Sequence, residues 1–231
     1  MNDFSRKYAL VTGAGEGIGL GICRALAQRG AIVALNDVRG DVAEDAAKAI
    51  NATIGVDRVF AYPGDVAKPE TVFRMVDAFV ETHGPPDIVI ANAGITRYME
   101  FLETTPDMFE KVVGVNLRGS YFTAQAGAKQ MVAHNKRGRI ILMSSVVGIQ
   151  AYPNFSLYGF TKAAIQMMAR TLSLELGTHG ITVNAISPGA TLTPRVERDD
   201  PNYTENWGTV TPTGRVGMVD DVVGAALYLA S

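Results

Sequence analysis

A phenol and an ammonium group stand four positions apart in this chain, at Tyr158 and Lys162. The segment around them is predicted to be helical, so both side chains should lie on one helix face, with Cβ atoms roughly 5–6 Å apart. An isolated tyrosine has a pKa near about 10, and a neighbouring positive charge lowers it. The spacing therefore predicts an acid/base catalyst that works near neutral pH. The alternative is a solvated lysine one turn from a packed tyrosine, and the pair alone does not decide between them.

A glycine-rich turn follows the first predicted strand and precedes a predicted helix. Its sequence is Thr12-Gly13-Ala14-Gly15-Glu16-Gly17-Ile18-Gly19. A strand, a glycine turn and a helix N-terminus together form an anion site, in which the backbone can approach a pyrophosphate closely. The glycine spacing differs from the usual G-x-G-x-x-G dinucleotide fingerprint. We expect the turn to bind a dinucleotide; the alternative is a tight turn without a ligand.

The residue that closes the second predicted strand bears on the choice of cofactor. Asp37 follows the glycines by about 20 residues, where an acidic group can accept hydrogen bonds from the adenosine ribose. The 2′-phosphate of NADP would meet a like charge there. Arg39, two residues further on, could hold that phosphate instead. We expect NAD, with NADP as the less favoured cofactor.

Strands that alternate with helices must position these groups. Short β-branched runs separated by longer helical patterns indicate βαβ units around a parallel sheet. The predicted strands are 7–11, 32–36, 58–62, 88–91, 139–143 and 181–186, and the predicted helices are 18–29, 42–51, 69–82, 106–134, 156–178 and 219–230. The stretch 191–214 has no periodicity and three prolines. It is predicted to be a substrate loop (about 190–215), since loops of this length are usually functional.

Composition narrows the class of protein. The 231 residues suit one α/β domain, and 21 Lys and Arg against 23 Asp and Glu leave no basic excess for nucleic acid or a membrane surface. No signal peptide or apolar run of about 20 residues is present, so no membrane association is expected. The single cysteine, Cys23, fits a reducing cytoplasm. His83, His134 and His179 lie near predicted helix ends, where capping explains them, and no metal site is expected.

The glycine spacing together with Tyr158-x3-Lys162 resembles the short-chain dehydrogenase/reductase superfamily, in its short single-domain branch, over nearly the whole chain. The resemblance implies one domain, 1–231, with a doubly wound Rossmann fold, strand order 3-2-1-4-5-6 and helices on both faces. It implies four catalytic residues, namely Asn116, Ser145, Tyr158 and Lys162. It implies cofactor contacts from the turn (Gly13, Gly15, Glu16, Gly17, Ile18, Gly19), from strand ends (Asp37, Asp65, Val66, Asn92, Ala93, Gly94), from Tyr158 and Lys162, and from Pro188, Gly189, Thr191 and Thr193.

Most of these residues follow predicted strands, so they should gather at the carboxyl edge of the sheet, where open parallel sheets bind ligands. Some have simpler explanations. Asn92 could cap a turn, Asp65 could begin a helix, and the adjacent Ser144 leaves open which serine is catalytic.

The resemblance also implies a reaction, the reversible oxidation of a secondary alcohol to a ketone with NAD taking the hydride. Tyr158 would transfer the proton, Lys162 would lower the pKa of Tyr158 and bind the nicotinamide ribose, and Ser145 would hydrogen-bond the substrate oxygen. Asn116 would hold a helix bend and a relaying water. We expect substrate contacts from Ser145, Tyr152 and Tyr158. The pocket walls are expected from Thr96, Val147, Ile149, Tyr152 and the loop, in which Trp207 either closes over substrate or contacts a second subunit.

Other functions remain open. A 3-oxoacyl-carrier-protein reductase that uses NADPH is disfavoured by Asp37 but favoured by the basic residues Lys129, Lys136, Arg137 and Arg139. A non-catalytic nucleotide sensor would usually have lost the tyrosine or the lysine. A sugar-nucleotide epimerase would carry a larger C-terminal substrate region.

The chain stops at Ser231, where family members usually continue into a seventh strand. That strand is expected to be missing, which leaves the edge after the sixth strand unpaired. The family suggests a homo-oligomer, a tetramer or a dimer.

Overall fold

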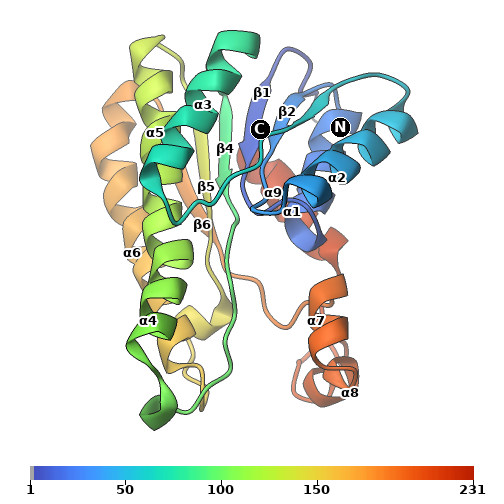
Figure 1. Ribbon diagram of the computed structural model, residues 1–231, viewed down its shortest axis with the longest axis vertical. Coiled ribbons are helices and arrows are strands. Elements are labelled where there is room, and N and C mark those ends of the chain that lie inside the picture. The colour runs from blue at the N-terminus through green and yellow to red at the C-terminus, as the bar shows by residue number, and fades with distance from the viewer. Residues whose placement is uncertain (1–2) are drawn as a thin grey trace.

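A parallel sheet of six strands forms the centre of the protein, whose computed structural model describes residues 3–231. The strand order is β3-β2-β1-β4-β5-β6, and each neighbouring pair is parallel. The strands are β1 (Tyr8–Val11), β2 (Ile32–Leu35), β3 (Val59–Ala61), β4 (Ile88–Ala91), β5 (Arg139–Met143) and β6 (Thr182–Ile186). The predicted doubly wound fold and its strand order are confirmed (Figure 1).

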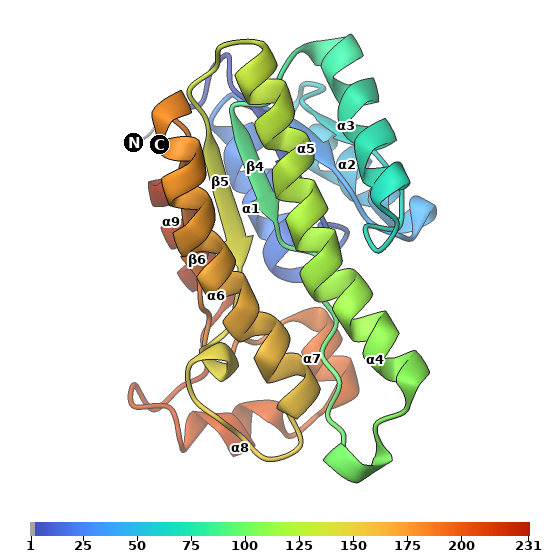
Figure 2. The same ribbon diagram turned by 90° about the vertical axis from the view of Figure 1, so that its left-hand side faces the viewer.

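Helices cover both faces of the sheet (Figures 1 and 2). One face packs against α1 (Gly17–Gln28), α2 (Gly40–Ile54) and α9 (Val219–Ala230), and the other against α3 (Pro69–His83), α5 (Gly119–Ala133) and α6 (Ser156–Leu176). Successive strand side chains alternate between the two layers: Ala9 and Val11 belong to one apolar core and Leu10 to the other. Burial on both faces explains why the strands read as continuous apolar runs.

The helix predicted over 106–134 is interrupted. It consists of α4 (Pro106–Val113), a π-helical turn (Gly114–Arg118) and α5, which run on as one rod in Figure 2. The π turn inserts an extra residue without breaking the rod, and such turns occur frequently at functional sites. Asn116 lies in this turn.

The stretch 191–214 is not the structureless loop that the sequence predicted. It contains two short helices, α7 (Pro194–Asp199) and α8 (Tyr203–Gly208), at the carboxyl end of the sheet (Figure 1). Thr193 caps α7 by accepting a hydrogen bond from the Val196 N–H at 3.3 Å, and Pro194 occupies the first turn. Helices of fewer than two turns leave no readable period in the sequence, which is why the prediction missed them.

Among the described residues, β6 pairs only with β5 and forms one edge of the sheet. No seventh strand lies beside it in residues 3–231, as expected. Over the same residues, no helix is both long enough and apolar enough to span a bilayer.

Candidate active site

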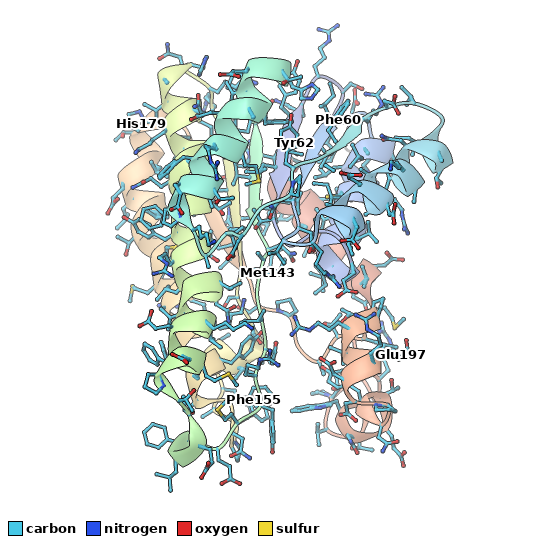
Figure 3. The ribbon with its side chains drawn as sticks, viewed as in Figure 1. Phe60, Tyr62, Met143, Phe155, His179 and Glu197 are labelled. Atoms are coloured by element: carbon cyan, nitrogen blue, oxygen red, sulfur yellow. The ribbon has the colours of Figure 1, made fainter. Side chains whose placement is uncertain are left out.

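Tyr158 and Lys162 share one face of α6 at the carboxyl end of the sheet, as their spacing predicts. The Lys162 Nζ lies 5.5 Å from the centroid of the Tyr158 ring. The lysine is 3% exposed and donates a hydrogen bond to the Met143 carbonyl at 2.7 Å. Met143, the last residue of β5, and Phe155, just before α6, are labelled in Figure 3 at this end of the molecule. The buried ammonium is therefore held beneath the phenol by the strand end.

Burial is the largest influence on the pKa of Tyr158 and on that of Lys162. Burial raises the pKa of Tyr158, and hydrogen bonding with Ser145 and Thr96 and the charge of Arg195 act in the opposite direction without cancelling it. Burial also lowers the pKa of Lys162 to about 8. The sequence predicted a Tyr158 pKa lowered by Lys162. The structure differs, because burial is the largest influence on the phenol and Lys162 is not among the groups that lower its pKa.

Ser145, and not Ser144, faces the tyrosine. The Ser145 Oγ accepts a hydrogen bond from the Val147 N–H at 3.2 Å and also bonds with the Tyr158 hydroxyl. The Ser144 Oγ donates to the Lys162 carbonyl at 2.7 Å, inside the packing of α6. The two serines therefore make different contacts: Ser144 holds α6, and Ser145 stays the predicted catalytic serine.

Asn116 is fully buried and connects three segments of the site. Its amide nitrogen donates to the Ile95 carbonyl at 3.0 Å and to the Thr161 hydroxyl at 3.2 Å, and its Oδ1 accepts from the Ile95 N–H at 2.8 Å. These bonds join the π turn to α6 and to the segment that follows β4. Asn116 lies in the π turn, and both the predicted helix bend and the predicted water relay stay predictions.

The glycine turn forms a cradle at the N-terminus of α1. Gly13 and Gly17 have φ of 59° and 63°, a left-handed conformation that favours glycine. A Cβ on Gly13 would lie 2.6 Å from the Ala93 Cα, so the turn and the end of β4 touch directly. Glu16 precedes α1 without capping it through its side chain. The first N–H groups of this twelve-residue helix are therefore free of a side-chain cap and can receive a pyrophosphate.

Asn92 supports this cradle from the neighbouring strand end. Its amide nitrogen donates to the carbonyls of Thr12 and Gly13 at 2.9 and 2.8 Å. The sequence predicted that Asn92 contacts the cofactor. In the structure, its amide nitrogen contacts the glycine turn instead. Next to it, Gly94 passes close to the catalytic group: a Cβ there would lie 3.3 Å from the Lys162 Nζ.

Asp37 lies two residues beyond the end of β2, beside the glycine turn. It is 7% exposed and accepts hydrogen bonds from the N–H groups of Gly15 and Arg39, both at 3.1 Å. The Arg39 guanidinium is shared between Asp37 at 3.5 Å and Glu16 at 3.4 Å. The arginine that could hold a 2′-phosphate is thus neutralised by two carboxylates.

The turn after β3 holds Asp65 and Val66. The Asp65 Oδ1 accepts from the Ala67 N–H at 3.0 Å. Val66 is buried, and a Cβ on Gly119 would lie 2.9 Å from its side chain. Val66 therefore packs against α5, and Asp65 orders the turn.

The segment after β6 lies against the cradle. The Val146 N–H donates to the Pro188 carbonyl at 2.9 Å, and the Thr191 hydroxyl donates to the Gly189 carbonyl at 3.1 Å. The Thr193 side chain lies 3.5 Å from the position of a Cβ on Gly17. Thr193 and the glycine turn are therefore neighbours, although 176 positions separate Gly17 from Thr193.

These observations fit a dinucleotide. The site offers open helix N–H groups for a pyrophosphate, a buried carboxylate for ribose hydroxyls, and the turn after β6 beside the Tyr158–Lys162 pair.

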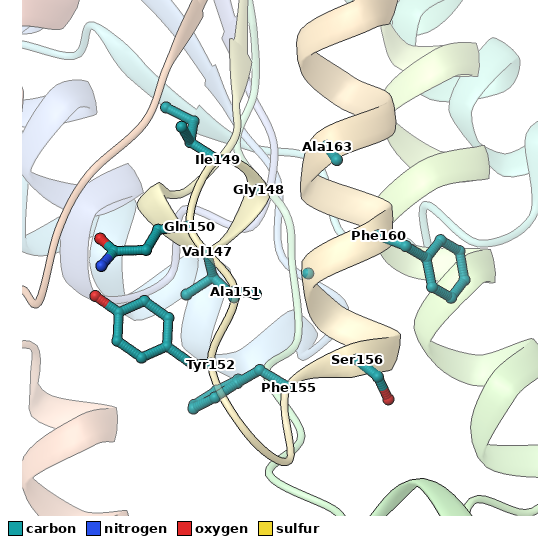
Figure 4. Close-up of a pocket in the computed structure, with 11 residues that line it drawn as sticks. Val147, Gly148, Ile149, Gln150, Ala151, Tyr152, Phe155, Ser156, Phe160 and Ala163 are labelled. Atoms are coloured by element: carbon teal, nitrogen blue, oxygen red, sulfur yellow. The ribbon is translucent and has the colours of Figure 1, made fainter.

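A cavity of about 260 Å³ adjoins the catalytic residues (Figure 4). It includes Val147, Ile149 and Tyr152 from the predicted substrate wall, but neither Ser145 nor Tyr158. Figure 4 shows Tyr152 and Gln150 pointing to the same side of the loop, while Phe160 projects from the far side of α6. The cavity therefore lies beside the predicted catalytic residues, between the loop before α6 and the first turns of that helix.

Trp207 of α8 packs over this wall. Its ring lies 5.7 Å from Tyr152 and 6.1 Å from Tyr203, centroid to centroid. Both predicted roles of Trp207, closing over substrate and contacting a second subunit, stay predictions. A salt bridge of 2.8 Å between Arg198 of α7 and Glu16 also fastens the segment to the glycine turn.

Sequence reasoning missed two groups: Arg195, which acts on Tyr158, and Gln166, which bonds to Ser145. Arg195 lies in the stretch that showed no periodicity, and its charge nonetheless acts on Tyr158. Gln166 follows Lys162 by one further helical turn, and that spacing was the signal that could have found it.

Known proteins resemble this chain along its length. A family model described as Enoyl-(Acyl carrier protein) reductase matches residues 13–231. An L-rhamnose 1-dehydrogenase (NAD(P)(+)) from a Sphingomonas species is 37% identical, over 97% of this chain and 89% of that protein. A 3-oxoacyl-[acyl-carrier-protein] reductase from Chlamydia trachomatis is 33% identical, over 97% of this chain and 90% of that protein.

A solved structure agrees with these matches. A short-chain type dehydrogenase/reductase from Mycobacterium marinum superposes with a TM-score of 0.93 at 35% identity, covering 99% of this chain and 90% of that one. The chain belongs to the short-chain dehydrogenase/reductase superfamily, and the relatives described above are named as dehydrogenases and reductases.

Proposed function

We propose that the protein interconverts a secondary alcohol and a ketone by hydride transfer, with NAD as its preferred cofactor. The observation that carries this proposal is the placement of Tyr158 between Ser145 and the buried Lys162, beside the glycine cradle. A bound nicotinamide would supply the hydride chemistry, held by the cradle, Asp37 and the turn after β6.

Each catalytic side chain has a task in this scheme. Tyr158 exchanges a proton with the substrate oxygen, which Ser145 orients through its hydroxyl. The raised pKa keeps Tyr158 protonated, as ketone reduction requires. For alcohol oxidation the tyrosine must lose its proton, and the positive charge of Lys162 favours that form. Asn116 fixes the relative position of α6 and the segment after β4.

A screen of alcohols, sugars and ketones with NAD(H) and NADP(H), read at the nicotinamide absorbance, tests the proposal. L-Rhamnose belongs in the first panel, because a relative with 37% identity is named for that substrate. The aromatic wall of Tyr152, Tyr203 and Trp207 supports a cyclic polar substrate. Cofactor binding without turnover on any panel member would favour a nucleotide sensor and contradict the proposed function.

The preference for NAD can be tested at Asp37. Replacing Asp37 with Asn removes the charge that would repel a 2′-phosphate, while Arg39 remains beside it. We expect the ratio of kcat/KM for NAD over NADP to fall by roughly tenfold, corresponding to about 1.4 kcal/mol. The measurement is steady-state kinetics with both cofactors. Asp41→Asn, on the exposed first turn of α2, is the matched control and should leave the ratio unchanged. An unchanged ratio in Asp37→Asn would contradict this role.

The carrier-protein alternative is less well supported. Arg139 begins β5, so it lies at the amino end of the sheet, opposite the catalytic edge, and Lys136 and Arg137 directly precede it. Lys136 is also bound to Asp87 at 3.0 Å. An acidic carrier that docks at this surface could not present its substrate to Tyr158.

We also propose that the protein is a homo-oligomer. Three large apolar residues of α6, Phe160, Met167 and Leu174, recur at intervals of seven and are 43%, 57% and 81% exposed. Such spacing places them in one stripe on the helix, which suits packing against a second copy. Light scattering after size exclusion tests this: Met167→Glu should lower the molar mass, and a monomeric wild type would contradict it.

A further inference from the structure

Gln166 occupies the same face of α6 as Tyr158 and Lys162, one turn further along the helix. Its amide nitrogen donates to the Ser144 hydroxyl at 3.2 Å, the Ser145 carbonyl at 3.4 Å and the Ser187 hydroxyl at 3.4 Å. One side chain thus contacts the segments that leave both β5 and β6. We propose that Gln166 is a positioning residue, which fixes Ser145 and the Ser187–Pro188 turn relative to the helix that carries Tyr158 and Lys162.

The surrounding contacts leave few other ways to hold these segments. The ends of β5 and β6 are joined to each other by the Ser144 N–H to Ile186 carbonyl bond at 2.7 Å and by the Val146–Pro188 bond. Those bonds hold the two turns to each other, but they do not attach either turn to α6. Two bonds join the end of β5 to the helix: the Ser144 hydroxyl donates to the Lys162 carbonyl, and the Lys162 Nζ donates to the Met143 carbonyl. Gln166 is the side chain that extends this attachment to Ser145 and Ser187.

The space around the amide is limited. A Cβ on Gly148, three residues after Ser145, would lie 2.7 Å from the Lys162 carbonyl carbon, 2.8 Å from the Ala163 nitrogen and 2.9 Å from the Gln166 Nε2. The short helical turn Val146–Gly148 therefore packs directly on the α6 backbone and on the Gln166 amide. A shift of this turn moves Ser145, because the Ser145 Oγ is bound to the Val147 N–H within it.

The consequence for chemistry follows from Ser145. Its hydrogen bond with Tyr158 is one of the contributions that lower the pKa of the tyrosine. If Ser145 moves away, that contribution is lost and the pKa of Tyr158 rises further. The rate of alcohol oxidation should then reach its maximum at a higher pH, since oxidation needs the deprotonated tyrosine.

The inference rests on the proposed function and is tested with Gln166→Met, which keeps the length of the side chain and removes its donors. We expect kcat to fall roughly tenfold, as small misplacements of reacting groups cost one to two orders of magnitude. We also expect an alkaline shift of the pH–rate profile and weaker NADH binding in a fluorescence titration, because the turn at Pro188 loses its attachment. Gln130→Met is the matched control: that amide donates to Asp77 on an exposed surface at 2.8 Å, far from the site in sequence and structure.

Gln166→Glu serves if the methionine variant does not fold. It preserves the shape but cannot donate to the Ser145 carbonyl, so the fall in kcat and the alkaline shift are expected. The Ser187 hydroxyl can donate to the carboxylate, so NADH binding should weaken less than in Gln166→Met. The double variant Ser187→Ala/Gln166→Met should lose less activity than the sum of the losses in the two single variants. Both substitutions remove the same hydrogen bond, between Gln166 and Ser187. A merely structural role would lower the melting temperature and leave the pH profile in place; that result, or wild-type kinetics in both Gln166 variants, overturns the inference.

Failure of the proposed function would look different. If the wild type binds NADH but turns over no substrate, the function is wrong, and NADH affinity alone decides the role of Gln166. Unchanged NADH affinity in both Gln166→Met and Gln166→Glu would then overturn the positioning role of Gln166.

Discussion

Tyr158→Phe should lower kcat by roughly a thousandfold while NADH binding stays at the wild-type level. Proton transfer by a positioned side chain contributes typically about 10²- to 10⁴-fold, and the variant removes only the hydroxyl that transfers the proton. The phenylalanine ring retains the contact with Phe155, whose ring centroid lies 6.0 Å away, so the fold should be unaffected. Steady-state kinetics with a substrate from the screen, together with a fluorescence titration of NADH, measure the two quantities.

Tyr152→Phe is the matched control, because it removes a hydroxyl from the adjoining wall without touching the proton path. We expect less than a tenfold loss there. The residual rate of Tyr158→Phe should also lose the part of its pH dependence that comes from the tyrosine, while the part that comes from Lys162, with its pKa of about 8, should remain. Turnover of Tyr158→Phe within tenfold of the wild type would show that another group carries the proton, and the mechanism proposed above would be wrong.

Gly13→Ala should destabilise the fold by about 2–5 kcal/mol and abolish cofactor binding. Alanine in the left-handed conformation costs roughly 1–2 kcal/mol, and overpacking against a neighbour costs about 1–3 kcal/mol. Both apply, because Gly13 has a φ of 59° and its added methyl group would lie 2.6 Å from the Ala93 Cα. This is a large fraction of the ~5–15 kcal/mol of a typical domain. Urea denaturation gives the free energy of unfolding, and NADH titration gives the binding.

Gly55→Ala separates the two costs. Gly55 has a φ of 75°, but nothing lies within 4 Å of an added Cβ, so only the conformational cost of about 1–2 kcal/mol remains. NADH binding should be unchanged in that variant. If Gly13→Ala were no less stable than Gly55→Ala, or still bound NADH, the close approach of the turn to β4 would not matter for the cradle.

The sequence predicted the architecture because its strands are short, apolar and separated by readable helical periods. The features that it missed are short, or they leave the apolar pattern unchanged. The helices α7 and α8 are six residues each, less than two turns. The π turn at Gly114–Arg118 keeps the apolar pattern of a helix, so an extra residue in one turn leaves no trace.

The site was predictable to the extent that topology determines it. Asp37, Asn92 and Ser145 follow parallel strands, and such positions meet at one edge whatever their side chains do. What each side chain bonds to could not be predicted. The Asn92 amide supports the glycine turn, and the burial of Tyr158 overrides the charge beside it. These outcomes depend on distances of a few tenths of an ångström, which residue spacing does not encode.

The bonds between Thr12 and the end of β4 have a consequence for folding. The Thr12 hydroxyl accepts from the Asn92 and Ala93 N–H groups, both at 3.2 Å, across 80 and 81 positions of the chain. The cradle therefore does not exist until the two halves of the sheet have joined at β1 and β4, a non-local contact that forms slowly. An unfolded or half-assembled chain offers the dinucleotide nothing to bind. Cofactor can consequently stabilise only the completed fold, and by mass action the cellular cofactor pool contributes to how long each molecule stays folded.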